Sequence, residues 1–355
     1  MLEIDGSAGG GQLLRSSLAL STLTDTPVRV VDVRGNRSNP GLKAQHVAAA
    51  RAIDRIANAE TNGVELGSDT VEFDPGDVSG GEYAVTVDTA GSLTLVFETV
   101  LPLALATDEP IRLRATGGTD VAWSPPLDYL QRVKLPFLRR HGIVAAIASE
   151  RRGFYPVGGG AATLTLGPSA PEPIEATASP AVAKARVYAV ASDDLADGDV
   201  AERLARTGTE MVAALDHGLE SPERVVEYAD ADCTGAAIVL RADAETGGDS
   251  PAATAPIAGF SALGGPDRSA EAVAGDAVDD FAAWLDTGAV VDRHLADQLV
   301  VPLAVRGGTV AIPEVTDHVA SSLDLVEEFG VAVDCKQKDG RAILQAEGAD
   351  LAGLE

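Results

Sequence analysis

The chain has 355 residues, of which 45% are hydrophobic and 23% charged, which excludes a single small module and a disordered chain and predicts two or three structural units. Its 54 acidic residues outnumber 27 basic ones, for a formal net charge of −27. This balance excludes a broad basic face for nucleic acid, so any such contact must be local. It also predicts a salt-rich cytoplasm, because concentrated salt screens the repulsion between acidic groups.

The first residues, MLEIDGSAGGGQ, contain no basic start followed by an apolar run, and no stretch approaches the roughly 18 apolar residues of a membrane span. We therefore expect no signal peptide, no membrane segment and a cytoplasmic protein. The two cysteines, Cys233 and Cys335, lie far apart without clustered Cys or His neighbours. This spacing predicts free thiols, and neither a disulfide framework nor a zinc site.

Two segments in the first half of the chain follow one pattern. A small-residue start, an apolar helix, a proline break and a β-branched strand occur in GGGQLLRSSLALSTLTDTPVRVVDV and again in GSLTLVFETVLPLALATDEPIRLRAT. Each is followed by a second helix, PGLKAQHVAAARAIDRIANA or PPLDYLQRVKLPFLRRHG, and then by strand-like residues with turns. The pattern predicts a repeated β-α-β-α-β-β unit.

A third copy follows after a long gap, in RHLADQLVVPLAVRGGTVAIPEV, HVASSLDLVEEFG and VAVDCKQKDGRAILQA. The gap begins at the Pro- and Ala-rich GPSAPEPIEATASPA and carries strand-like and helix-like segments of its own. We therefore predict an α/β (α+β) fold in which three βαβαββ units form a large domain and a smaller α/β domain is inserted before the third. The expected boundaries are 1–177 for repeats one and two, 178–262 for the inserted domain and 263–355 for the third repeat.

Two loops of the first unit have the composition of an anion site. In loop 6–11, GSAGGG, glycines let backbone amides approach an anion at a helix N-terminus, although a plain tight turn is the alternative. Loop 34–41, RGNRSNPG, is a cationic run in an acidic chain, and guanidinium groups match phosphate geometry. A solvated loop is the alternative there. The candidate anion pocket comprises Arg15, Arg34, Arg37, Lys43, Gln45 and His46.

The segment 152–160, RGFYPVGGG, ends in three consecutive glycines before a strand-like run. Such glycines lose much backbone entropy on folding, so either another group approaches closely or the chain bends sharply.

Among the histidines, His141 and His217 precede glycines at predicted helix ends, which indicates helix capping. His318 lies at a strand-to-helix turn, PEVTDH, where an imidazole can be a base, a ligand or a nucleophile, or simply a first-turn residue. The chain has no GxSxG or HExxH motif, so hydrolase and metalloprotease functions are not supported.

In their order along the chain, these segments resemble the RNA 3'-terminal phosphate cyclase family. The resemblance runs nearly end to end and rests on DGS followed by GGGQLLRSSLALS, RGNRSNPGLKAQH, GGTDVAWSPPLDYLQRV, RGFYPVGGG, HLADQLVVPLA and the late histidine of TDHVASS. It implies three repeated units with an inserted domain. It also implies a ligase that converts an RNA 3'-phosphate end to a 2',3'-cyclic phosphate with ATP, through a covalent histidine-AMP, and that uses a divalent Mg or Mn ion.

The resemblance further implies roles for individual residues. His318 corresponds to the nucleophile that accepts AMP. The positions that correspond to nucleotide binding are Glu98, Pro126, His294, Leu295, Ala296, Asp297 and Gln298. The positions that correspond to binding of the RNA 3'-phosphate are Arg15, Arg34, Arg37, Gln45 and His46.

Four places in the sequence depart from the family pattern. The opening DGSAGGGQ is shorter and lacks the glutamate associated with the metal, so the metal ligands are not predicted. Glu98 and His294 stand where bacterial members have glutamine and tyrosine, which predicts altered adenine and ribose contacts. Residues 320–322, ASS, replace a more typical Thr-Asn after the nucleophile.

Two other interpretations stay open. A non-catalytic relative of the cyclases binds RNA in ribosome assembly and lacks the nucleophile, so the presence of His318 favours the enzyme. An enolpyruvyl transferase shares the repeat architecture and gathers arginines around phosphate, but that class lacks the RGFYPVGGG segment and needs no histidine nucleophile.

Overall fold

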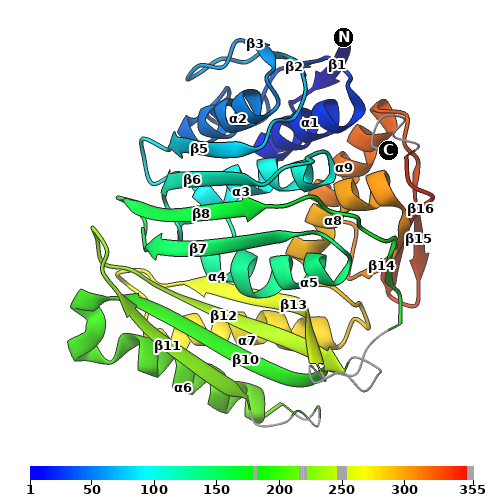
Figure 1. The fold of residues 1–355 in the computed structure, drawn as a ribbon. Helices are drawn as coiled ribbons and strands as arrows, with labels where there is room; N and C mark the ends of the chain where they lie inside the picture. The colour runs from blue at the N-terminus through cyan, green and yellow to red at the C-terminus, as the bar shows by residue number, and fades with distance from the viewer. Residues whose placement is uncertain (179–181, 216, 218, 220–221, 246–253, 350–355) are drawn as a thin grey trace.

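The structure is a computed structural model that describes residues 1–178, 182–215, 217, 219, 222–245 and 254–349 (Figure 1). The first unit runs β1 (Leu2–Asp5), α1 (Gly10–Thr24), β2 (Val28–Val31), α2 (Ala44–Ile56), β3 (Glu60–Asn62) and β4 (Val71–Asp74). The second runs β5 (Gly81–Thr86), α3 (Leu93–Val100), the 3₁₀ helix η1 (Leu101–Leu105), β6 (Ile111–Gly117), α4 (Leu127–Tyr129), the π-helical η2 (Leu130–Lys134), α5 (Leu135–Arg140), β7 (Ala145–Arg151) and β8 (Gly160–Leu166).

The third unit is interrupted by the inserted domain. It runs β9 (Ile174–Ala176), then α8 (Arg293–Arg306), β14 (Gly308–Ile312), α9 (Asp317–Glu328), β15 (Val333–Lys338) and β16 (Arg341–Ala346). The insertion runs β10 (Val182–Ser192), the 3₁₀ helix η3 (Asp193–Gly198), α6 (Val200–Ala213), β11 (Glu223–Ala229), β12 (Ala236–Glu245), β13 (Thr254–Leu263) and α7 (Ala270–Leu285).

Three four-stranded sheets share one connectivity. Their orders are β1-β2-β4-β3, β5-β6-β8-β7 and β9-β14-β16-β15, and in each the first pair is parallel and the other two are antiparallel. The fourth sheet, β11-β10-β12-β13, belongs to the insertion. The predicted mixed α/β fold is confirmed, and each of the three sheets arises from strands in the βαβαββ order.

The third sheet begins before the insertion, within the range 1–177 that the sequence assigned to repeats one and two. β9 lies in the Pro- and Ala-rich stretch, and its Ile174 pairs in parallel with Gly308 of β14 and so opens the third sheet. At the far end, α7 falls in the expected third repeat but packs on the inserted sheet, where Phe281 and Trp284 are buried against Phe260. A three-residue strand flanked by prolines carries too little pattern to be recognised from sequence.

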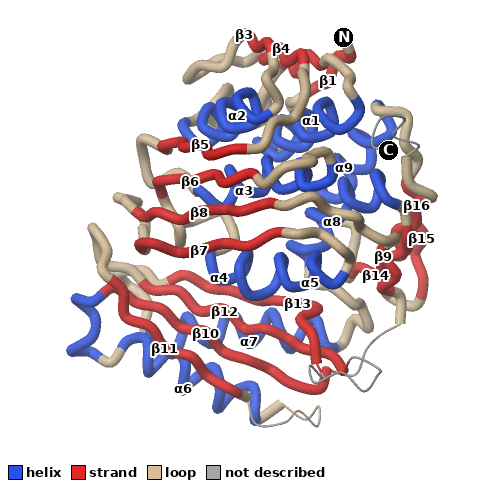
Figure 2. Tube along the Cα trace, viewed as in Figure 1, coloured by secondary structure: helices blue, strands red, loops and turns tan. Residues whose placement is uncertain are grey.

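The helices of the three units form the interior, with the sheets outside them (Figures 1 and 2). α1 packs against α2, α3 and α9, and α8 packs against α9. α1 is buried on nearly every side, as expected for a central helix. One hydrophobic cluster joins the three units, and a second lies between the inserted sheet, α6 and α7. No helix of the described chain is long and apolar enough to cross a membrane.

The glycine-rich segment 152–160 combines the two explanations given for it. A Cβ on Gly160 would lie 2.7 Å from the Gly153 nitrogen, so two backbone strands approach too closely for side chains. Gly158 and Gly159 also adopt φ values of +78° and +75°, which favour glycine.

Arg152, at the start of this segment, links the second unit to the insertion. Its buried guanidinium donates to Asp128 at 2.6 Å, to Asp120 at 3.3 Å and to Glu227 of β11 at 3.3 Å. Burial raises the pKa of Asp120 and the charge of Arg152 opposes that rise. Asp120 therefore depends on this cation, whereas Asp128 also pairs with Arg132 at 3.5 Å.

We expect Arg152→Ala to lower the free energy of unfolding by about 3–5 kcal/mol, because it leaves the buried Asp120 carboxylate without a cation. Denaturant unfolding measures this change. Arg112→Ala is the control, since Arg112 and Glu82 form an exposed pair at 4.0 Å that contributes about 0–1 kcal/mol. Equal losses in the two variants would contradict the role of Arg152.

Candidate functional site

The first turns of α1, α2 and α3 meet at one place in the large domain. α1 approaches α2 so closely that a Cβ on Gly11 would collide with Nε2 of His46. α2 meets α3 where the Ser92 N–H donates to Oε1 of Gln45 at 3.1 Å. Ser92 also caps α3 by accepting from the Leu95 N–H.

α8 and α9 complete this group. Thr316 caps α9 by accepting from the Val319 N–H, and its hydroxyl donates to Oδ1 of Asp297 in α8 at 3.0 Å. Gln12 in α1 donates to the Ser322 hydroxyl in α9 at 2.7 Å. Helix N-termini carry partial positive charge, so their convergence favours an anion.

Loop 34–41 adds cationic side chains to these helix ends. Arg34 is held in a left-handed conformation, φ +60°, and donates to the carbonyls of Asn39 at 2.8 Å and Gly41 at 2.9 Å. The Lys43 ammonium donates to Asn39 Oδ1 at 2.6 Å. A Cβ on Gly10 would lie 3.2 Å from Arg37, so the glycine loop and the cationic loop lie against each other.

His46 is buried and neutral among these charges. Burial and the charges of Arg15, Arg34 and Lys43 lower its pKa to about 3. Its Nδ1 accepts the Lys43 N–H at 3.0 Å, which leaves the proton on Nε2, beside Gly11 and Arg15. His46 can therefore donate a hydrogen bond without adding another positive charge. The structure thus brings together all five residues expected at the phosphate: Arg15, Arg34, Arg37, Gln45 and His46.

His318 lies in the first turn of α9, with its side chain accessible to solvent. Partial burial and the charges of Arg37 and Arg15 lower its pKa, so the imidazole is neutral near pH 7. A neutral imidazole has a free lone pair and can act as a nucleophile. Arg15 thus acts on both His318 and His46.

Glu98 of α3 lies in a buried polar cluster between the second and third units. Oε1 of Glu98 accepts from the Gln298 amide at 2.5 Å and pairs with the Lys134 ammonium at 3.5 Å. Burial lowers the pKa of Lys134, and the charge of Glu98 opposes this shift. Lys134 was not predicted from the sequence. The chain has five lysines, and this rarity was the feature that could have drawn attention to Lys134.

Asp297 lies between this cluster and α9. Burial, aided by the charges of Asp292 and Glu98, raises its pKa to about 7, against the hydrogen bond from Thr316. The carboxyl therefore changes its protonation state near neutral pH.

His294 lies in the first turn of α8 beside Tyr129, with their rings edge to face at 6.0 Å. Tyr129 donates to Asp292 at 2.8 Å, and Asp292 accepts the His294 N–H at 2.8 Å. Pro126 is the buried N-cap of α4, the helix that carries Tyr129. Tyr129 and Asp292 were missed in the sequence because neither lies in a recognisable ligand-binding motif.

Leu295 and Ala296 differ from the other residues of α8 that were predicted to bind the nucleotide. Their side chains are fully buried in the main core, and their N–H groups bond to Asp292. They hold α8 in place and present no side chain to a ligand.

The carboxylates near the pocket do not form a preformed metal site. Glu98 pairs with Lys134, and Asp297 bonds to Thr316. Among the described residues no group of three or more His, Cys, Asp or Glu side chains is arranged to hold a metal ion. The residues therefore do not fit the divalent ion that the resemblance implies, and no step below depends on it.

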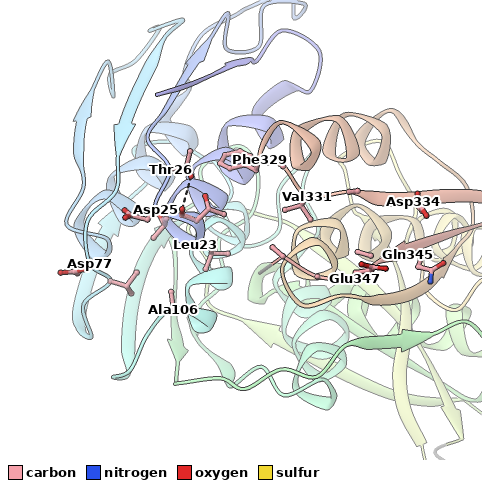
Figure 3. Close-up of a pocket in the computed structure, with 18 of the residues that line it drawn as sticks. Leu23, Asp25, Thr26, Asp77, Ala106, Phe329, Val331, Asp334, Gln345 and Glu347 are labelled. Atoms are coloured by element: carbon pink, nitrogen blue, oxygen red, sulfur yellow. Dashed lines mark hydrogen bonds between the residues drawn. The ribbon is translucent and has the colours of Figure 1, made fainter. Parts of the chain in front are cut away.

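A separate hollow lies at the C-terminal ends of α1 and α9 (Figure 3). This groove of about 1300 Å³ is lined by acidic side chains, among them Asp25, Asp77, Asp334 and Glu347. Helix C-termini and carboxylates repel anions. The groove contains none of the residues of the candidate anion pocket.

We expect Gly11→Ala to weaken binding of inorganic pyrophosphate by about 10-fold or more, equivalent to losing one charge-assisted hydrogen bond, because the new methyl group displaces His46 and Arg15. Isothermal titration calorimetry measures the affinity. Gly275→Ala in α7 is the control, since its Cβ would meet only the end of Met211 at 3.8 Å. Unchanged affinity in Gly11→Ala would contradict the pocket.

Comparisons with known proteins support one family. The family model for RNA 3'-terminal phosphate cyclase matches residues 7–335. The RNA 3'-terminal phosphate cyclase of Halobacterium salinarum is 45% identical, with 97% of this chain and 99% of the relative covered. Those of Ectopseudomonas mendocina and Pyrococcus furiosus are each 38% identical, with 96% and 93% of both chains covered, respectively. The chain therefore belongs to the RNA 3'-terminal phosphate cyclase family.

Proposed function

We propose that this protein converts an RNA 3'-terminal phosphate to a 2',3'-cyclic phosphate, with ATP as the second substrate and His318 as the nucleophile. The observation that carries the proposal is the position of His318, a neutral imidazole within the influence of Arg15 and Arg37. One group of arginines can then serve both the phosphoryl group that is transferred and the phosphate that receives it. Family membership supports the RNA end and ATP as substrates.

The reaction has three balanced steps. An imidazole nitrogen of His318 attacks the α-phosphorus of ATP, forming a P–N bond while the bond to the β-phosphate oxygen breaks and pyrophosphate leaves. An oxygen of the RNA 3'-phosphate then attacks that phosphorus, the P–N bond breaks and a phosphoanhydride forms. Finally the neighbouring 2'-hydroxyl loses its proton and attacks the activated RNA phosphorus, and AMP leaves.

The arginines supply electrostatic stabilisation throughout these steps. Negative charge moves between phosphoryl oxygens in each displacement, and guanidinium groups fixed in advance stabilise it. By analogy with the loss of an oxyanion-hole donor, removal of Arg15 or Arg37 costs about 3 kcal/mol in the transition state. Arg34 is tied to backbone carbonyls and Gln45 to Ser92, so both keep the pocket in shape as well.

We assign nucleotide binding to the groups between α3, α4 and α8. Glu98 and Gln298 lie at the inner end, Pro126 and His294 at the helix starts, and Asp297 next to the N-cap of α9. Leu295 and Ala296 support this site through packing.

The first test is incubation with ATP labelled at the α-phosphate, in high salt with magnesium or manganese, followed by denaturing electrophoresis. We expect acid-labile label on the wild type and none on His318→Ala. His141→Ala is the matched control, because His141 ends α5 and packs on Phe137, and it should keep the label. RNA binding without label transfer in any condition would instead support the non-catalytic interpretation.

The second test is the pH dependence of this labelling. Because the pKa of His318 lies below its ordinary value of 6.5, the nucleophile stays neutral at pH 6.5, and the rate should fall only at lower pH. Arg37→Gln removes one charge that lowers this pKa, so its acid limb should move to higher pH.

Two controls separate the groups that titrate. Arg112→Gln removes an exposed charge of β6 and should leave the limb in place. Asp297→Asn removes the carboxyl whose pKa is about 7, and an acid limb that disappears in this variant would contradict its assignment to His318.

A further inference from the structure

Two aromatic side chains project into solvent from adjoining loops. Trp123 is 92% exposed and Tyr155 is 57% exposed. The chain has two tryptophans, and the other, Trp284, is buried. A large aromatic surface left in water is unfavourable unless a partner covers it, so this placement calls for a function.

Hydrogen bonds hold the loop that carries Trp123 and the loop that carries Tyr155 together. The Thr119 N–H donates to the Gly153 carbonyl at 2.8 Å, and the Gly153 N–H donates back to the Thr119 hydroxyl at 2.8 Å. Asp120 and Phe154 form a bridge between the loops, three residues before Trp123 and one residue before Tyr155, respectively. Trp123 has φ +64°, a conformation that costs an L-residue roughly 1 kcal/mol and that this loop maintains.

These two loops lie next to the candidate anion pocket. The Leu93 N–H donates to the Gly118 carbonyl at 2.9 Å, and the Thr94 hydroxyl donates to the Pro125 carbonyl at 3.0 Å, so both ends of the Trp123 loop rest on the start of α3. The same helix start receives Gln45 through Ser92. The Trp123 loop and Gln45 of the candidate anion pocket thus meet at the N-terminus of α3.

We propose that Trp123, with Tyr155 beside it, binds the 3'-terminal bases of single-stranded RNA by stacking while the pocket holds the terminal phosphate. This proposal rests on the proposed function. With a net charge of −27, the protein cannot hold an RNA backbone along a basic groove. Stacking needs no charge, tolerates any base and is not screened by salt, so it supplies affinity where phosphate contacts are weakest.

The first test is the KM for a 3'-phosphorylated oligonucleotide. Trp123→Ala should raise it by at least about 5-fold, the equivalent of one stacked base, and leave label transfer from ATP unchanged. Trp123→Phe should restore most of the affinity, and Tyr155→Ala should give a smaller rise. Val144→Ala is the control, because Val144 is 54% exposed at the other end of β7 and should have no effect.

The dependence of KM on salt concentration distinguishes base stacking from a purely structural role of Trp123. The effect of Trp123→Ala should persist as KCl rises, whereas the effect of Arg37→Gln on KM should shrink because its phosphate contact is screened. If the wild type cyclises RNA and Trp123→Ala has the wild-type KM at every salt concentration, the stacking proposal is wrong and the proposed function stands.

Fluorescence tests the stacking without catalysis. In Trp284→Phe the emission comes from Trp123 alone among tryptophans, and the 3'-phosphorylated oligonucleotide should quench it. An oligonucleotide with abasic sites at its 3'-terminal positions should quench much less, and equal quenching would overturn the proposal. A wild type that forms no cyclic phosphate contradicts the proposed function alone, and the quenching then decides the stacking independently.

Discussion

The candidate anion pocket depends on holding several positively charged side chains close together. Arg15, Arg34, Arg37 and Lys43 lie close enough that their charges depress the pKa of neighbouring histidines, which means that they also repel one another. The fold resists this repulsion with neutral acceptors, as when two backbone carbonyls hold Arg34. No carboxylate is used for this purpose in the contacts described. The pocket therefore gains its best counter-charge only when an anion enters.

The helices contribute to the same arrangement. Five of them begin around the pocket, so the partial positive charge of their N-termini adds to that of the arginines. Glu98, an acid whose charge acts on Arg15, is also paired with Lys134 and Gln298. The groove at the C-terminal ends of α1 and α9 is acidic. These two helices therefore run from a cationic region at their N-termini to an acidic region at their C-termini. A strongly acidic protein can thus keep one small cationic site.

The sequence was sufficient for features that repeat or are local. The three units were visible because helix and strand periods recur around Pro27 and Pro110, and the N-terminal turn of α9 was visible around His318. The predicted second helix of unit two is instead α4, a π-helical turn and α5. Pro136 interrupts the hydrogen bonding there, and the wide turn ends at Lys134.

Contacts between units could not be read from the sequence. The pairs Glu98 with Gln298 and Gln12 with Ser322 join helices from different repeats, and their partners are fixed only when the units pack. The burial that lowers the pKa of His46 and raises that of Asp297 arises in the same way. The residue types in the sequence indicated a phosphate site. The protonation states of these residues could be inferred only once the fold showed which of them are buried.

The position of β9 has a consequence for the order in which the chain folds. Sheets one and two are built from strands close in sequence, whereas Ile174 must find Gly308 across the whole insertion. Closing so long a loop is entropically costly until the inserted domain has folded and brought its ends together. We therefore expect the third sheet to form last. Since α8 and α9 belong to that unit, His318 would reach the arginines in the final stage of assembly, and the proposed transfer of AMP could not begin on an incompletely folded chain.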